Sequence, residues 1–304
     1  MMILNGISQS TTWPSVVSCM GNWFGKGKKG LLMGVWATNG NFGNMIGYFI
    51  QNMAVNRMKL DWKYSLFFSG MFLLVLGVVC VLYLDPYPQK FENQINSQHN
   101  KDVAENINYF SAWVKVPGLA MYAIAMGGVK GTIYGIIFWL PIYLQKNGMK
   151  EQAVVICSMN EIGTFAGGVL LGYLVDKFQQ RAFVINLFIF LSFINMVILY
   201  NMPPGNPGPY YFLVLLAGIF LGGPYNMIGG SVAIDLVEQS GFQSSKHLLA
   251  LVTAIIDSTG SISGAFIQTT ISFFGYQQIF AIFIVTTMLS SLVLIKQAKL
   301  DIYK

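Results

Sequence analysis

The fold class is decided by residues 182–234, which read AFVINLFIFLSFINMVILYNMPPGNPGPYYFLVLLAGIFLGGPYNMIGGSVAI and contain no charged residue. About 20 apolar residues cross a bilayer as a helix, so this stretch is long enough for two crossings. The segment NMPPGNPGP at residues 201–209 separates them, because clustered Pro and Gly residues favour a turn. A pair of membrane-spanning helices joined by a short turn is therefore predicted here.

Similar apolar stretches, interrupted by at most single ionisable residues, occupy most of the remaining chain, at residues 1–25, 30–56, 64–84, 116–145, 152–175 and 247–295. The last of them contains a turn signal, FGYQ, at residues 274–277. Together these stretches predict an all-α, polytopic membrane protein with about nine spanning helices. The composition agrees, since only 10% of the residues are charged, against about 25% in soluble domains, and the mean hydropathy is +0.56.

Several classes of function are not expected. The net charge of +6 comes from basic residues between apolar stretches, without a basic face or a nucleic-acid-binding motif, so no nucleic-acid partner is predicted. The cysteines Cys19, Cys80 and Cys157 are isolated, and His99 and His247 lie in or next to polar connections. These positions predict no disulfide framework, no metal site and no nucleophile–base pair. We therefore expect neither an enzyme nor a bound cofactor.

Residues 85–116 form the only long polar connection and predict a linker between two helical bundles. Residues 1–84 would form an incomplete N-terminal bundle, and residues 117–304 a C-terminal bundle of about six helices. Most Lys and Arg residues flank the side that holds the linker and the C-terminus, so the positive-inside rule makes that side cytoplasmic. This side also includes a basic cluster at a helix end that we interpret as a membrane anchor, namely Lys26, Lys28 and Lys29. The sequence indicates no oligomeric state.

A weak internal repeat relates the two parts of the chain. KGLLMGV at residues 29–35 matches KHLLALV at residues 246–252, and Pro14 has a counterpart in Pro224. Such a parallel repeat of two bundles is found in major-facilitator transporters. Because Pro224 would lie in the fourth helix of its bundle and Pro14 in the first helix of the chain, about three helices are expected to be missing before Met1.

More specific motifs closely resemble the sugar-phosphate exchanger family (solute carrier family 37), and they extend through nearly the whole chain, from that family's fourth helix to its twelfth. They are WPSVV (13–17), GNWFGKGKKG (21–30), MGVW (33–36), FWLPIY (138–143), GPY (223–225) and TAIIDSTGS (253–261). GYLVDK at residues 172–177 resembles the loop motif of the wider major facilitator superfamily.

The resemblance implies a major-facilitator fold of twelve helices, with about nine of them in this chain. It also implies exchange of a sugar phosphate such as glucose 6-phosphate, or of glycerol 3-phosphate, for inorganic phosphate by alternating access. The endoplasmic reticulum or another endomembrane would be the location. Two alternatives remain open. A facilitator of the same fold could carry another small solute, because fold does not fix function, or the chain could be a membrane protein that transports nothing.

Lys130 is the first candidate for substrate binding, because it is the only Lys or Arg inside a predicted spanning segment. A cation at the centre of a membrane helix costs about 3 kcal/mol on insertion scales, so it usually faces a cavity or a charged partner. A lysine ammonium suits a phosphate as a point charge with three donors. The alternative is a structural one, in which Lys130 neutralises Glu161 of the next helix.

Three further residues are predicted to line the substrate site, namely Trp36, Asn39 and Tyr134. The aromatic side chains could equally serve helix packing. Relatives often have a histidine three residues after the tryptophan that corresponds to Trp36, which is the position of Asn39. Asparagine keeps a hydrogen-bond donor but cannot be protonated, so a proton-linked contact would be lost there.

Three acidic residues are predicted to act in gating or as counter-ions, namely Glu161, Asp176 and Asp257. A carboxylate repels phosphate, so direct contact with the substrate is not expected of Glu161. For Asp257 the favoured interpretation is helix packing or a salt bridge. The resemblance also implies that the family's other main cation, a first-helix arginine, lies outside this chain.

Overall fold

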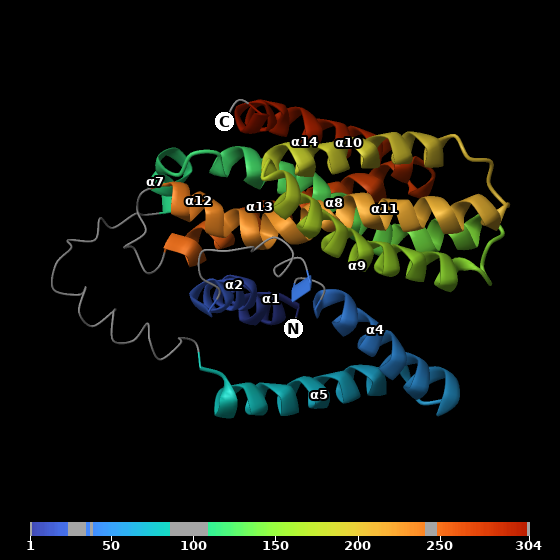
Figure 1. Ribbon diagram of the computed structural model, residues 1–304. Coiled ribbons are helices and arrows are strands. Elements are labelled where there is room, and N and C mark those ends of the chain that lie inside the picture. Colours follow the sequence, from blue (N-terminus) through green and yellow to red (C-terminus); the bar gives the residue numbers. More distant parts are fainter. Residues whose placement is uncertain (1, 24–34, 37–38, 86–108, 241–247, 303–304) are drawn as a thin grey trace. The chain divides into compact units, whose positions relative to one another are not determined.

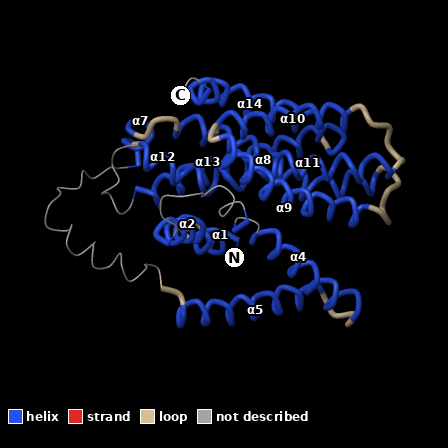
Figure 2. Tube along the Cα trace, in the orientation of Figure 1, coloured by secondary structure: helices blue, strands red, loops and turns tan. Residues whose placement is uncertain are grey.

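The computed structural model describes residues 2–23, 35–36, 39–85, 109–240 and 248–302, and every regular element in these ranges is a helix (Figure 2). The chain forms two compact units. The larger combines Met1–Ala37 with Asp102–Lys304, and the smaller consists of Thr38–Lys101. The prediction of an all-α protein is thus confirmed for the described residues.

The larger unit is dominated by long helices that run along one another (Figure 1). In chain order its elements are α1 (Met2–Gln9), α2 (Thr12–Trp23), α7 (Tyr109–Lys115), α8 (Leu119–Lys146), α9 (Ala153–Phe178), α10 (Arg181–Tyr200), α11 (Pro207–Met227), the π-helical segment η2 (Ile228–Val232), α12 (Ala233–Gln239), α13 (Leu248–Phe274), the 3-10 turn η3 (Tyr276–Gln278) and α14 (Ile279–Ile302).

Seven helical stretches in the described residues are long and apolar enough to cross a membrane: Trp62–Tyr83, Leu119–Lys146, Ala153–Phe178, Arg181–Tyr200, Pro207–Gln239, Leu248–Phe274 and Tyr276–Leu300. They match the predicted stretches from residue 64 onward, including both predicted breaks. The first two predicted stretches are not among them. Residues 1–25 contain the separate helices α1 and α2, and the start of residues 30–56 lies outside the described residues.

The smaller unit is a pair of helices. In it α4 (Asn39–Gln51) continues into the π-helical segment η1 (Asn52–Arg57), and after a short turn α5 (Trp62–Tyr83) begins. The side chain of Asp61 caps α5 by accepting a hydrogen bond from the backbone N–H of Lys63 at 3.5 Å. None of the residues of α5 is buried, so the helix exposes apolar side chains all round, as lipid-facing helices do.

The predicted domain boundaries remain a prediction. Residues 86–108, most of the predicted linker, lie outside the described residues, and α7 occupies its last part. The compact units divide the chain differently, because α2 packs against α13 and so belongs to the larger unit. The proposed anchor of Lys26, Lys28 and Lys29 also lies outside the described residues.

Helices α9 and α11 make the most extensive contact of the bundle, and glycines allow it. A Cβ atom added to Gly167 would meet the carbonyl oxygen of Ile219 and would lie 2.8 Å from its Cα. A Cβ added to Gly218 would lie 2.9 Å from the backbone nitrogen of Thr164. Lipid tails are as apolar as leucine, so membrane helices associate through such close packing rather than through the hydrophobic effect.

Helix α8 lies at the centre of the larger unit and packs chiefly against α13 and α14. On the α14 side, a Cβ added to Gly128 would lie 2.7 Å from the carbonyl oxygen of Thr286. On the α13 side, the indole of Trp139 donates a hydrogen bond to Gln268 at 2.8 Å, and Gln268 in turn donates to the backbone of Gly131 at 3.2 Å. These contacts fix the rotation of α8, and therefore the direction of its single lysine in the helix interior.

Candidate functional site

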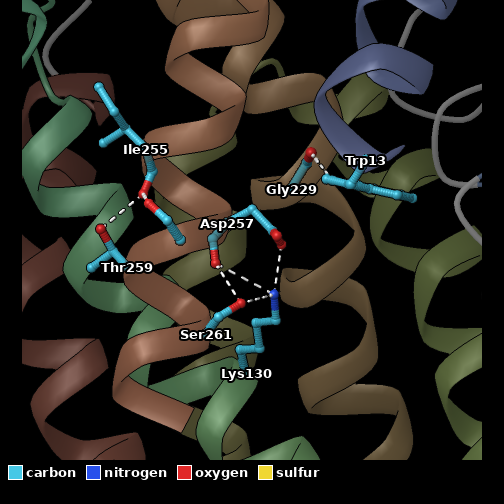
Figure 3. Close-up of polar contacts among 8 residues, drawn as sticks. Trp13, Lys130, Gly229, Ile255, Asp257, Thr259 and Ser261 are labelled. Atoms are coloured by element: carbon cyan, nitrogen blue, oxygen red, sulfur yellow. Dashed lines mark hydrogen bonds and ion pairs between the residues drawn. The ribbon is translucent and has the colours of Figure 1, made fainter. Parts of the chain in front are cut away.

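Lys130 is buried inside the bundle, with a side chain that is 4% exposed. Its ammonium forms an ion pair with the carboxylate of Asp257 on α13, at 2.6 Å from Nζ to Oδ1 (Figure 3). It also donates to the hydroxyl of Ser261 at 3.0 Å and approaches the backbone carbonyl of Asp257 at 3.4 Å. The donor capacity of the ammonium is thus directed at one short stretch of α13.

Helical spacing explains why α13 supplies these groups together. Asp257 and Ser261 are four residues apart, so both side chains lie on one face of the helix. The hydroxyl of Ser261 donates to the backbone carbonyl of Asp257 at 3.0 Å, which leaves its oxygen free to accept from Lys130. Gly260 makes room for the lysine stem, since a Cβ there would lie 2.8 Å from Cδ of Lys130.

Two tyrosines complete the polar cluster. Tyr134 lies one turn after Lys130 on α8, and its ring centroid is 5.7 Å from the ammonium, within cation–π range. Tyr225 on α11 interacts with Tyr134 through its side chain and is close enough to Asp257 to sense its charge. The Lys130 cluster, consisting of Lys130, Tyr134, Tyr225, Asp257 and Ser261, therefore draws on three helices and offers one cation among several hydroxyl groups.

The two ends of the ion pair differ in exposure. The side chain of Lys130 is 4% exposed and that of Asp257 is 29% exposed. Removing two charges from water is costly, and the attraction between them offsets that cost only while both are present. An anion that reaches Lys130 must therefore compete with Asp257, and the carboxylate is the more accessible member of the pair.

The partner of Lys130 corrects one sequence-based interpretation. The structural alternative paired Lys130 with Glu161, but the carboxylate that contacts the ammonium belongs to Asp257. Glu161 is buried on α9, and Asp176 lies half-buried near the end of the same helix. Their roles as gating residues or counter-ions stay predictions.

The other predicted site residues lie in different places. Tyr134 joins the Lys130 cluster, whereas Trp36 stacks on Trp13, with ring centroids 5.4 Å apart and an interplanar angle of 23°. Asn39 is the first residue of α4, in the smaller unit. Its predicted contact with the substrate therefore remains a prediction.

Sequence reasoning did not assign Ser261, Tyr225 or Trp13 to the site. Ser261 carried a usable signal, because it follows Asp257 by four residues on an otherwise small and apolar helix. Tyr225 and Trp13 belong to the GPY and WPSVV motifs, but nothing in the sequence shows which helices are neighbours. Among the described residues, no three His, Cys, Asp or Glu side chains form a group that could hold a metal ion.

A groove of about 940 Å³ opens between α13 and α14 and does not coincide with the Lys130 cluster. Its walls are mainly apolar, with Ile262 and Phe266 on α13 and Val285 and Leu289 on α14. Neither Lys130 nor Asp257 lines it. The residues that line this groove include no cation for an anionic substrate. The Lys130 cluster is therefore the better candidate for binding phosphate.

Comparison with known proteins gives a consistent picture. The sequence matches the Major Facilitator Superfamily over residues 1–266. It is 31% identical to mouse "Sugar phosphate exchanger 3", covering 94% of this chain and 64% of that protein. It is 30% identical to mouse "Glucose-6-phosphate exchanger SLC37A2", covering 96% and 65%.

A plant relative shows similar identity. The sequence is 31% identical to "Putative glycerol-3-phosphate transporter 5" of Arabidopsis thaliana, covering 99% of this chain and 68% of that protein. Across these three relatives the chain spans 64% to 68% of the relative's length. The resemblance noted in the sequence is therefore confirmed.

Proposed function

Because the chain belongs to the major facilitator superfamily, we propose that it serves as a multi-pass membrane transporter that exchanges a phosphorylated sugar or glycerol phosphate for inorganic phosphate. The observation that carries this proposal is the buried Lys130, whose ammonium meets Asp257 at 2.6 Å. A buried cation among hydroxyl donors suits a phosphate group, which needs positive charge and hydrogen bonds together. The names of the relatives, which are sugar-phosphate exchangers and a glycerol-3-phosphate transporter, support the same substrate class.

The proposed mechanism is a competition for one cation. In the empty site Asp257 holds Lys130, and an incoming phosphate takes the place of the carboxylate on the ammonium. When phosphate leaves, Asp257 returns, so Lys130 does not remain unpaired in its buried position. Ser261 and Tyr134 would supply hydroxyl groups to the bound phosphate. Alternating access then exposes the loaded site to one side of the membrane or the other.

The proposal extends to partners and location. The transported ligands are the phosphate ester and inorganic phosphate, and the bilayer is the environment of the spanning helices. We place the protein in the endoplasmic reticulum or another endomembrane, on the strength of the resemblance to the sugar-phosphate exchangers. Solute exchange of this kind forms no covalent bond, so no enzymatic activity is part of the proposal.

The substrate class can be tested by binding. In detergent, the purified chain should bind inorganic phosphate, and glucose 6-phosphate and glycerol 3-phosphate should displace it at least about tenfold better than glucose, because glucose lacks the group that meets Lys130. Isothermal titration calorimetry measures the affinities, and counterflow in vesicles measures exchange. Equal displacement by glucose would indicate another solute, and a folded protein without phosphate binding would contradict the proposal.

The competition can be tested with Asp257→Asn. This substitution removes the carboxylate that competes for Lys130 and leaves the lysine without a counter-ion. Phosphate should therefore raise the melting temperature of Asp257→Asn more than that of the unchanged protein, since a ligand that binds the folded state stabilises it. Differential scanning fluorimetry with and without phosphate measures both shifts.

A matched control for Asp257→Asn is available in the same bundle. Asp235 on α12 forms an ion pair with Arg181 at the start of α10, away from the Lys130 cluster. Asp235→Asn also removes one half-buried, ion-paired carboxylate, so it should lower the melting temperature but leave the phosphate-induced shift unchanged. If both variants respond to phosphate alike, Asp257 does not compete with phosphate.

A further inference from the structure

A hydrogen bond connects α2, in the first part of the chain, to the bundle beside the Lys130 cluster. The indole N–H of Trp13 on α2 donates to the backbone carbonyl of Gly229 at 2.9 Å (Figure 3). The two residues are 216 positions apart in the chain. Around this bond α2 packs against α13, the helix that carries Asp257. The Trp13 side chain thus reaches the bundle next to the candidate site.

The acceptor lies in an unusual stretch of helix. Gly229 belongs to the π-helical segment Ile228–Val232, whose residues are all buried and which links α11 to α12. A π turn replaces the i+4 hydrogen-bond pattern by i+5, so the backbone pairing changes at its ends. Buried carbonyl groups nearly always have a partner, and Trp13 supplies one here. The indole packs directly against this residue, since a Cβ at Gly229 would lie at van der Waals distance, 3.4 Å, from the Trp13 ring nitrogen.

One methionine separates this bond from the lysine stem. Met126 lies one helical turn before Lys130 on α8, so their side chains share a face. The Met126 side chain would lie 3.6 Å from a Cβ at Gly229. It would also lie 3.3 Å from a Cβ at Gly260, the residue against which Lys130 packs. Met126 therefore lies between Gly229 of the π-helical segment and Gly260, the residue that adjoins the Lys130 stem.

We propose that Trp13 is a positioning residue, and that its hydrogen bond to the π-helical segment Ile228–Val232 is released and re-formed during the exchange cycle. The inference rests on the proposed function. Trp13 lies next to Pro14 in the first sequence repeat, and Gly229 lies shortly after Pro224 in the second. Alternating access requires the two repeats to move relative to each other around the substrate. A contact between the repeats at the substrate site must then change during that movement.

The physical consequence concerns the conformational step rather than phosphate affinity. Trp13 does not contact Lys130 directly, so the phosphate would bind with or without the indole N–H. The π-helical segment can alter its hydrogen-bond pattern locally without ending the helix. The Trp13 hydrogen bond would stabilise one hydrogen-bond pattern of the π-helical segment over another. Phosphate binding at Lys130 would change the relative populations of these two patterns through Met126.

Hydrogen–deuterium exchange of the full chain tests the proposal. Trp13→Phe keeps an aromatic ring and removes the N–H donor. We expect backbone amide exchange in Ile228–Val232 to accelerate about fivefold, because one hydrogen bond contributes about 1 kcal/mol net. The dissociation constant for inorganic phosphate should change by less than about twofold. Trp62→Phe on α5, where the tryptophan is 61% exposed, is the matched control and should change neither quantity.

A second measurement separates positioning from mere stability. Saturating inorganic phosphate should change the exchange of Ile228–Val232 in the unchanged protein, and Trp13→Phe should abolish this response while phosphate still binds. Peptides from α14 serve as an internal reference and should not accelerate in Trp13→Phe. Unchanged exchange in Ile228–Val232, equal acceleration in α14, or a preserved phosphate response would each overturn the proposal.

The two proposals can fail separately. If the unchanged protein does not bind phosphate, the proposed function fails, and so does the proposed release of the Trp13–Gly229 hydrogen bond during exchange. Accelerated exchange in Trp13→Phe would then still establish the bond to the π-helical segment. If phosphate binds and the π-helical segment does not respond to it, the proposed function stands and only the inference about Trp13 fails.

Discussion

Lys130→Ala is expected to weaken binding of inorganic phosphate by about 10- to 100-fold, because a hydrogen bond to a charged group contributes about 1.5–3 kcal/mol. The side chain is 4% exposed, so water would not replace the lost ammonium effectively. Lys130→Arg should retain part of the affinity, since the charge persists while its geometry changes. Calorimetric titration of phosphate into each variant measures the effect.

The control for Lys130→Ala is another lysine of the same helix. Lys146 lies at the end of α8 with its ammonium 5.2 Å from the ring centroid of Tyr276. Lys146→Ala removes the same charge but should leave phosphate binding within about twofold of the unchanged protein. General attraction between a positively charged protein and an anion would instead weaken binding equally in both variants.

A structural role for Lys130 makes a different prediction. Lys130→Ala alone leaves the carboxylate of Asp257 without its partner, so poor folding could resemble poor binding. The double variant Lys130→Ala with Asp257→Asn removes both charges and should fold better than the single variant. If it also bound phosphate normally, Lys130 would be only a structural partner and the site assignment would be wrong.

The second large effect is expected in folding. Gly167→Val should lower stability by more than about 3 kcal/mol, beyond the usual 1–3 kcal/mol of an overpacked core, because the new side chain meets backbone atoms. A Cβ at this position would lie 2.8 Å from the Cα of Ile219 on α11. Helices α9 and α11 would have to separate along their whole contact. Melting temperature and the yield of monodisperse protein in detergent measure the loss.

Gly77→Val on α5 is the matched substitution. A Cβ at Gly77 would have no atom within 4 Å, so the same change adds a side chain without a clash. Valine is also a somewhat better helix former than glycine. The yield of Gly77→Val should therefore equal that of the unchanged protein. If Gly167→Val behaved in the same way, the close approach of α9 and α11 would not be a requirement of the fold.

Apolar length and turn residues predicted most helices and the breaks between them, but not the polar and π-helical positions within one helix. The apolar stretch that ends at residue 234 continues as α12 to Gln239, and Asp235 within it pairs with Arg181. An acidic residue therefore does not end a helix when a basic one from another helix reaches it. The π-helical segment Ile228–Val232 has no signature in hydrophobicity, since it changes hydrogen bonding while every side chain stays apolar or small.

The sequence predicted Lys130 as a site residue but did not predict its ion-pair partner. Lys130 is identified by its cost in a membrane helix, which depends on the sequence alone. Its partner depends on which helices are neighbours. Glu161 lies on the next helix along the chain, but α8 packs chiefly against α13 and α14, which brings Asp257 to the lysine. The four-residue spacing from Asp257 to Ser261 was the available signal for that face of α13.

The distance along the chain between Lys130 and Asp257 also has a consequence for biosynthesis. The two residues are 127 positions apart, so at about 5–20 residues per second a ribosome takes roughly 6 to 25 s to reach the aspartate after the lysine. During this time α8 must enter the membrane with an uncompensated charge, at a cost of about 3 kcal/mol. The nascent chain therefore needs the translocon, or helices made earlier, to shelter Lys130 until α13 is inserted.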